Sequence, residues 1–246
     1  MKKIFKEFME DFLLTLTFLS RIPINLNSET FERIRNMPTY FPLIGYIPGT
    51  IYYFGSYLAS KNIESTFSAF FTMVLGFYLF DLFHFDGLLD MFDGFLNQST
   101  KERRLEIMSK GNVGPFAVFY GTLYVIAFWE LLNISRPVYF LFASVFGRYT
   151  MVVVLHFSRP AKKEGLGAML YPHSQRILFN ALVATFPLFF FKPYVYVLAL
   201  IGSMLIGIVL SYISEKKIGG VTGDVIGGSC LLSQLFILFI LNGILK

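Results

Sequence analysis

Long apolar runs alternate with short polar stretches along most of the chain. The runs cover residues 39–60, 63–83, 115–133, 137–157, 177–191, 194–213 and 225–245. Most of them approach the roughly 20 residues that a helix needs to cross a bilayer. The pattern therefore predicts an all-α, polytopic bundle of about seven transmembrane helices, which forms a single integral-membrane domain over residues 1–246.

A different pattern precedes these runs in residues 1–38. Large apolar side chains recur there at helical spacing, and a polar stretch follows them from Asn25 to Asn36. The apolar stripe consists of Phe5, Phe8, Phe12, Leu16 and Leu19. Amphipathic helices of this kind lie along membrane surfaces. We expect residues 1–38 to be an interfacial segment on the cytoplasmic side.

The composition supports a membrane protein and argues against other classes. Hydrophobic residues make up 55% of the chain, a share that a soluble domain of this size would not tolerate. The single cysteine, Cys230, excludes an internal disulfide and a cysteine metal site. The net charge of +5 is dispersed over short loops, which indicates membrane topology and no nucleic-acid partner.

Positive residues gather in alternate polar stretches. The N-terminal segment and the loops 84–114, 158–176 and 214–224 hold 16 of the 21 lysines and arginines. Positive loops stay in the cytoplasm, so these stretches are expected on that side of a cytoplasmic (inner) membrane. The topology would bring the chemical motifs of the chain to one cytoplasm-facing site.

The central motif lies at the end of the second apolar run. Asp86, Asp90 and Asp93 are spaced i, i+4, i+7, which places them within about 60° of one another around a helix. Such acids on a soluble helix usually form a solvated face, whereas at the edge of a membrane span they indicate function. Clustered carboxylates require a cation, and Mg²⁺ is the expected one. Asp81 and His84 fall on another face, as a supporting pair.

Two basic residues admit a structural and a functional interpretation. Lys110, near Gly111 and Gly114, either belongs to a linker helix with topology charges or approaches a phosphate. Arg148 lies inside an apolar run and needs an anionic partner. That partner is either a buried aspartate or an anionic substrate.

Two glycine-containing loops are further candidates. Arg159 and Glu164, followed by Gly165, suit either lipid contact or close approach to a polar ligand. Thr222, Gly223 and Asp224 end a glycine-rich turn before the last run. Amides at a helix N-terminus favour phosphate, and Asp224 either joins the metal or caps the helix.

Taken together, these motifs resemble the cobalamin synthase family, also called adenosylcobinamide-GDP ribazoletransferases. The stretch from His84 to Gly94 matches the family pattern of a His, an apolar residue and DGLxDxxDG. Further matches in order are Phe18–Pro23, Phe41–Gly45, Arg103–Met108, Glu164–Gly167 and Gly219–Asp224. The resemblance covers nearly the whole chain.

The resemblance implies a Mg²⁺-dependent membrane transferase. It would join adenosylcobinamide-GDP to α-ribazole or α-ribazole 5′-phosphate, giving adenosylcobalamin or its 5′-phosphate and GMP. Asp86 and Asp90 would hold Mg²⁺, with Asp93 as third ligand or base and Asp224 beside them. The residues expected at substrate phosphates or the nucleotide are Lys110, Arg148, Arg159, Glu164, Gly165, Thr222 and Gly223. Membrane lipid and a homo-oligomer are further expected partners.

The chain departs from the family pattern at two places. Lys110-Gly111-Asn112 stands where the family usually has Asp-Ser-Arg before the glycine, and Leu231 and Gln234 stand where glutamates are frequent. Two alternatives to the family activity stay open at this point. One is an enzyme like the CDP-alcohol phosphotransferases. The other is a cation transporter, although its ionisable residues would be expected near the midplane.

Overall fold

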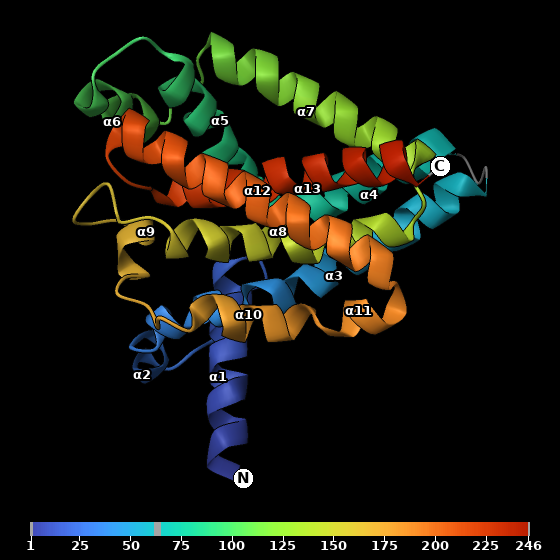
Figure 1. Ribbon diagram of the computed structural model, residues 1–246, viewed down its shortest axis with the longest axis horizontal. Helices are drawn as coiled ribbons and strands as arrows, with labels where there is room; N and C mark the ends of the chain where they lie inside the picture. The colour runs from blue at the N-terminus through green and yellow to red at the C-terminus, as the bar shows by residue number, and fades with distance from the viewer. Residues whose placement is uncertain (1, 62–64, 246) are drawn as a thin grey trace.

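The computed structural model describes residues 2–61 and 65–245, and these form helices joined by short loops (Figure 1). The elements are α1 (Lys2–Phe18), α2 (Ser28–Phe31), the 3₁₀ helix η1 (Ile34–Tyr40), α3 (Phe41–Ser60), α4 (Ser65–Gly76), the π-helical turn η2 (Phe77–Asp81), α5 (Leu82–Leu96), α6 (Lys101–Ser109), α7 (Pro115–Ile134), α8 (Val138–His156), α9 (Leu166–Met169), α10 (Ile177–Thr185), α11 (Pro187–Phe191), α12 (Pro193–Ile218) and α13 (Gly223–Ile244). The predicted all-α class is confirmed.

Five helices of the described chain are long and apolar enough to cross a membrane. They are Thr66–Leu96, which joins α4, η2 and α5, and the helices α7, α8, α12 and α13. The expected count of seven is not confirmed. Helix α3 forms where a span was expected, but it is not among these five, since its prolines, glycines and tyrosines lower its hydropathy. The run 177–191 is short and is divided into α10 and α11 at Phe186.

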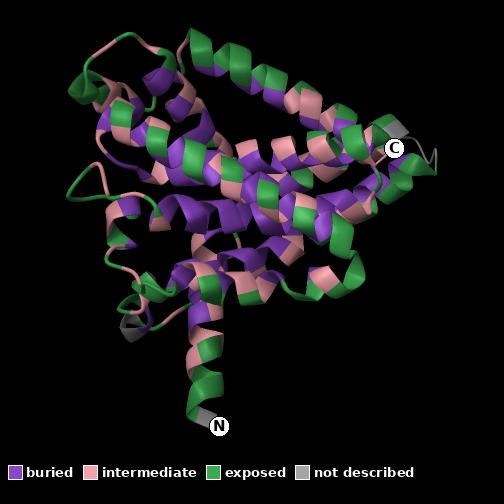
Figure 2. Cartoon of the chain, viewed as in Figure 1, coloured by how far each residue is buried: buried purple, intermediate pink, exposed green. Residues whose placement is uncertain are grey.

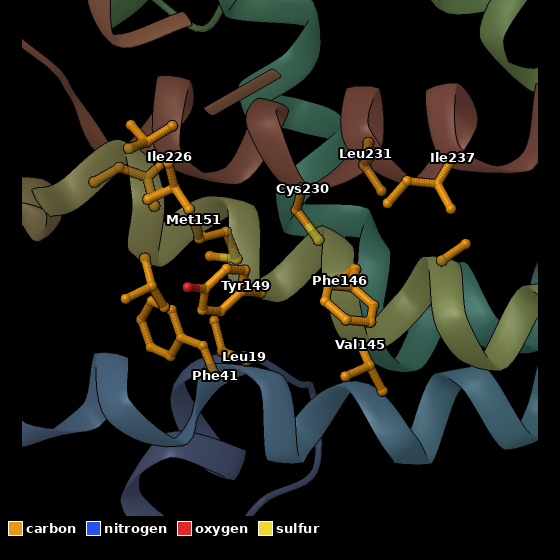
Figure 3. Close-up of a cluster of buried hydrophobic side chains, with 14 of the residues drawn as sticks. Leu19, Phe41, Val145, Phe146, Tyr149, Met151, Ile226, Cys230, Leu231 and Ile237 are labelled. Atoms are coloured by element: carbon orange, nitrogen blue, oxygen red, sulfur yellow. The ribbon is translucent and has the colours of Figure 1, made fainter. Parts of the chain in front are cut away.

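Helix α8 lies at the centre of the bundle, and 89% of its most apolar stretch is buried (Figure 2). It packs against α3, α12 and α13. A Cβ on Gly45 of α3 would lie 2.7 Å from the Ser144 carbonyl oxygen, and one on Gly147 would lie 2.8 Å from that of Cys230. Such small residues let membrane helices approach closely. Figure 3 shows the resulting core, with α8 between α3 and α13.

A buried polar network crosses this core. Arg148 and Asp81 are fully buried, and Arg148 Nη2 donates to Asp81 Oδ1 at 2.9 Å. The other Asp81 oxygen accepts from the Tyr52 hydroxyl at 2.6 Å, and His84 Nδ1 lies 3.4 Å from Oδ1. Of the two partners considered for Arg148, the structure shows the buried aspartate.

Helix α1 projects from the body at a steep angle to the long helices (Figure 1). Its first turns expose Ile4 and Phe5, whereas Leu14 near its end is buried in the core. Asp11 ties the helix to η1, since Arg33 donates to its two oxygens at 2.5 and 2.9 Å. The hydrogen bond to Asp11 raises the pKa of Arg33. The amphipathic character expected of this segment is present, and its position on a membrane surface stays a prediction.

The Asp81–Arg148 pair leads to a first prediction. Asp81→Leu should lower the free energy of unfolding by about 3–5 kcal/mol, because it leaves a buried charge unpaired. Adding Arg148→Met should recover most of this loss, since no charge then remains to be compensated. Denaturant unfolding of the purified protein in detergent measures both effects. Losses that simply add in the double variant would contradict a direct coupling.

Candidate functional site

The acidic motif lies on a helix that continues directly from a membrane span, as the spacing predicted. Helix α5 meets the start of α13 through glycines on both sides. A Cβ on Gly87 would lie 2.8 Å from the Asp224 Cα, and one on Gly228 would lie 3.1 Å from the Leu88 Cα. These glycines bring the two backbones together. Asp224 is thereby within electrostatic range of Asp86 and Asp90.

A cavity of about 780 Å³ opens beside this contact. Its polar wall comes from the beginning of α5, the loop around α9 and the start of α13, and its apolar wall comes mainly from the end of α1 and from η1. The polar wall includes His84, Asp86, Lys162, Glu164, Thr222 and Asp224, and the apolar wall includes Leu14, Phe18, Ile22, Phe31, Ile34 and Met37. Pockets with an apolar body and a few convergent polar groups are typical binding sites.

The glycine-rich turn builds one corner of the cavity. Helix α12 ends at Ile218 with Gly219 as its C-cap, whose φ of 78° is left-handed, and Thr222 is the N-cap of α13. The Thr222 Oγ1 accepts from the Val225 amide at 3.4 Å and donates to Asp224 Oδ2 at 3.0 Å. The expected helix N-terminus at this turn is confirmed. Thr222 performs the capping, while Asp224 lines the cavity.

A short backbone bridge attaches the second loop to this turn. The Val221 amide donates to the Arg159 carbonyl at 2.8 Å, and the Ala161 amide donates to the Val221 carbonyl at 2.9 Å. A Cβ on Gly167 would lie 2.7 Å from the Gly223 amide nitrogen, so only glycine allows this approach. The bridge brings Glu164 and Gly165 to the same cavity as Asp224.

The structure therefore gathers six of the expected site residues around one cavity. They are Asp86, Glu164, Gly165, Thr222, Gly223 and Asp224. Asp90 is half-buried one turn along α5 from Asp86, within electrostatic range of Asp86 and Asp224.

Asp93 has a different environment from the other two acids of its motif. It is buried, and its carboxylate accepts from the amides of Gly114 at 2.5 Å and Ala117 at 3.0 Å. These amides belong to the N-terminus of α7, where unpaired N–H groups and the helix dipole favour a carboxylate. Asp93 thus caps α7, a contact that the helical spacing alone could not indicate.

The three expected cations lie outside the cavity. Arg148 is enclosed in the bundle with Asp81, and Arg159 is exposed and pairs with Glu215 at 2.6 Å. Lys110 pairs with Glu106 on α6 at 2.6 Å. Hydrogen bonds from Lys110 and then Arg103 lower the pKa of Glu106 to about 2. For Lys110, this ion pair matches the linker-helix interpretation.

The sequence interpretation missed several cavity residues. Arg21 and Lys162 line the cavity, and so does His84, which was expected only as a support. Arg21 lies in the stretch Phe18–Pro23, which matches the family pattern, and that match could have indicated a place for Arg21 at the site. The apolar wall from residues 14–41 was not expected at the site at all.

The carboxylates decide whether the site fits a metal. Among residues 2–61 and 65–245, no group of three or more His, Cys, Asp or Glu side chains forms a ready metal site. Mg²⁺ is commonly bound by one or two carboxylates together with water and substrate phosphates. Asp86 and Asp224, with Asp90 nearby, fit an ion whose coordination the substrate completes.

The fold and the site define a multi-pass helical membrane protein with a cavity that several carboxylates line. The model of the cobalamin-5-phosphate synthase family matches residues 11–242. The chain belongs to this family and is a transferase of cobalamin synthesis, as the sequence resemblance indicated. Membership in this family argues against the two alternatives, an enzyme like the CDP-alcohol phosphotransferases and a cation transporter.

Curated relatives are similar in sequence to this chain over nearly their whole length. The adenosylcobinamide-GDP ribazoletransferase of Fervidobacterium nodosum is 58% identical over 95% of this chain and 97% of its own. The enzyme of the same name from Thermosipho africanus is 52% identical over 95% and 99%. That of Clostridium tetani is 28% identical over 97% and 98%. No solved structure matches the chain.

The role of Asp93 as a cap yields a second prediction. Asp93→Ala should lower the free energy of unfolding by about 1–2 kcal/mol and speed hydrogen exchange at the Gly114 and Ala117 amides, because both lose their acceptor. Asp93→Asn keeps one acceptor oxygen and should show a smaller effect. Unchanged exchange, combined with a higher Mg²⁺ requirement for turnover, would instead favour the metal-ligand role expected from the sequence.

Proposed function

We propose that this chain joins adenosylcobinamide-GDP to α-ribazole or α-ribazole 5′-phosphate and releases GMP. The observation that carries the proposal is the meeting of Asp86 and Asp224 in one cavity at the N-terminus of α13. The relatives' names supply the reaction, and the cavity has the chemistry that a diphosphate substrate requires.

We assign Mg²⁺ to Asp86 and Asp224, with Asp90 as the adjacent carboxylate. A bound Mg²⁺ would neutralise the diphosphate and the departing phosphate of GMP. The first residues of α13, Gly223 and Asp224, line the same cavity, and a helix N-terminus favours an anion through its dipole. Thr222 keeps this N-terminus ordered by capping it.

The chemical step is a displacement at phosphorus. A ribose hydroxyl oxygen of the acceptor forms a bond to the phosphorus nearer the cobinamide, and the bond from that phosphorus to the GMP oxygen breaks. The hydroxyl proton passes to a cavity carboxylate that does not hold the metal. The apolar wall from α1 and η1 limits the access of water, which would otherwise compete with the ribose hydroxyl.

We further propose that the site faces the cytoplasm and that the outer apolar surface contacts lipid. The loops rich in lysine and arginine support this orientation. Exposed aromatic and aliphatic side chains on α7, such as Phe119, Leu123 and Ile126, support lipid contact.

The third prediction concerns the metal and its ligands. Purified protein in detergent should release GMP and form cobalamin with Mg²⁺, and should lose both activities in EDTA. Asp86→Asn and Asp224→Asn should each lower kcat/KM at least about 100-fold, because an amide is a weaker Mg²⁺ ligand than a carboxylate. The measurement is product formation at varied Mg²⁺ concentration.

The control for this experiment is Glu102→Gln, which removes an exposed acid on α6, outside the cavity. It should keep wild-type turnover. Normal Mg²⁺-dependent activity in both aspartate variants would refute the assigned metal site.

The orientation gives a fourth prediction. In a Cys230→Ala background, the Lys163→Cys variant should react with a membrane-impermeant maleimide only after the cells are opened. Its loop lines the cavity, which we place on the cytoplasmic side. The Arg136→Cys variant, in the α7–α8 connection on the opposite side of the membrane, should react in intact spheroplasts. The reverse labelling pattern would place the site outside.

A further inference from the structure

The position of Arg21 depends on an irregular turn in a membrane helix. Residues Phe77–Asp81 form a π turn, η2, between α4 and α5. A π turn shifts the hydrogen-bond ladder of a helix and is frequent at functional sites. The Leu79 carbonyl within this turn accepts from the Arg21 amide at 2.7 Å. The chain leaving α1 is thereby attached to the helix that carries the acidic motif.

Aromatic contacts then fix the side chain of Arg21. Its guanidinium carbon lies 4.7 Å from the ring centroid of Tyr78 and 5.9 Å from that of Phe83. Stacking on aromatic rings preorganises a guanidinium, whose planar donors match phosphate oxygens. Arg21 remains exposed to the cavity, which also includes Phe83 and Asp86 in its wall.

Lys162 is the second cation of the cavity. It lies in the loop that the Val221 bridge holds against the start of α13, within electrostatic range of Asp224. Among the described residues, Arg21 and Lys162 are the lysine and arginine side chains of the cavity wall. They share it with three carboxylates, Asp86, Glu164 and Asp224, which would repel a phosphate in the absence of cations.

We propose that Arg21 and Lys162 bind the diphosphate of the nucleotide-activated corrinoid, a role that rests on the proposed function. Arg21 holds the non-bridging oxygens through its planar donors, and Lys162 supplies a second positive charge beside Asp224. The substrate class is a nucleoside diphosphate ester. The acceptor α-ribazole has no phosphate, so it does not depend on these cations.

Steady-state kinetics tests this assignment. Arg21→Gln should raise the KM for adenosylcobinamide-GDP at least about tenfold, the scale of a lost charged hydrogen bond, and leave the KM for α-ribazole unchanged. Arg21→Lys, which keeps the charge but loses the planar donors, should be intermediate. Arg136→Gln, at an exposed arginine outside the cavity, is the matched control and should behave as wild type. An unchanged KM for the corrinoid, or a rise confined to α-ribazole, would overturn the proposal.

Measurements of nucleotide binding test the diphosphate site independently of the proposed reaction. Wild-type protein should bind GDP more tightly than GMP in the presence of Mg²⁺, and Arg21→Gln and Lys162→Gln should each reduce that difference. Lys162 is exposed on a loop, so its variant decides the outcome if Arg21→Gln does not fold. Selective GDP binding without product formation would refute the proposed function and support the diphosphate site. GDP binding that neither substitution affects would refute the site, even in an active enzyme.

Discussion

The buried ion pair between Arg148 and Asp81 is the constraint on which the arrangement of the bundle depends. A full positive charge in the most enclosed helix is stable only with an anionic partner. That partner comes from the π turn between α4 and α5, and Tyr52 of α3 binds its second oxygen. The pair therefore fixes α3, α5 and α8 relative to one another. It also orients the end of the span that carries the acidic motif.

The π turn that carries Asp81 also connects the buried ion pair to the cavity. Its Leu79 carbonyl binds the Arg21 amide, and His84, one turn beyond Asp81, lines the cavity. Further along the same face of α5, Gly87 allows Asp224 to approach. Interactions that stabilise the bundle thus also position both walls of the site. We expect substitutions in the buried pair to alter activity as well as stability.

The sequence predicted those features that local pattern determines. Long apolar runs predicted the bundle, and the spacing of Asp86, Asp90 and Asp93 correctly placed them on a helix at the end of a span. The same spacing could not show that Asp93 caps α7, because the capped amides are 21 and 24 residues away in sequence. Likewise, the expected span over 39–60 rested on the length of the apolar run, whereas the prolines, glycines and tyrosines of α3 leave it outside the five candidate spans. Arg21 was missed because its position depends on a π turn that has no clear sequence signature.

The amphipathic character of the cavity follows from its two sources. Membrane helices supply acids at the edge of the bundle, where metal and phosphate can be hydrated, whereas α1 and η1 supply large apolar side chains. A diphosphate activated by metal is open to attack by any nearby hydroxyl, including water. An enzyme that transfers to a ribose hydroxyl must therefore exclude water while it admits a polar substrate. The end of the N-terminal segment, held to η1 by the Asp11–Arg33 pair, is suited to this task because Leu14, Phe18 and Leu19 line the cavity.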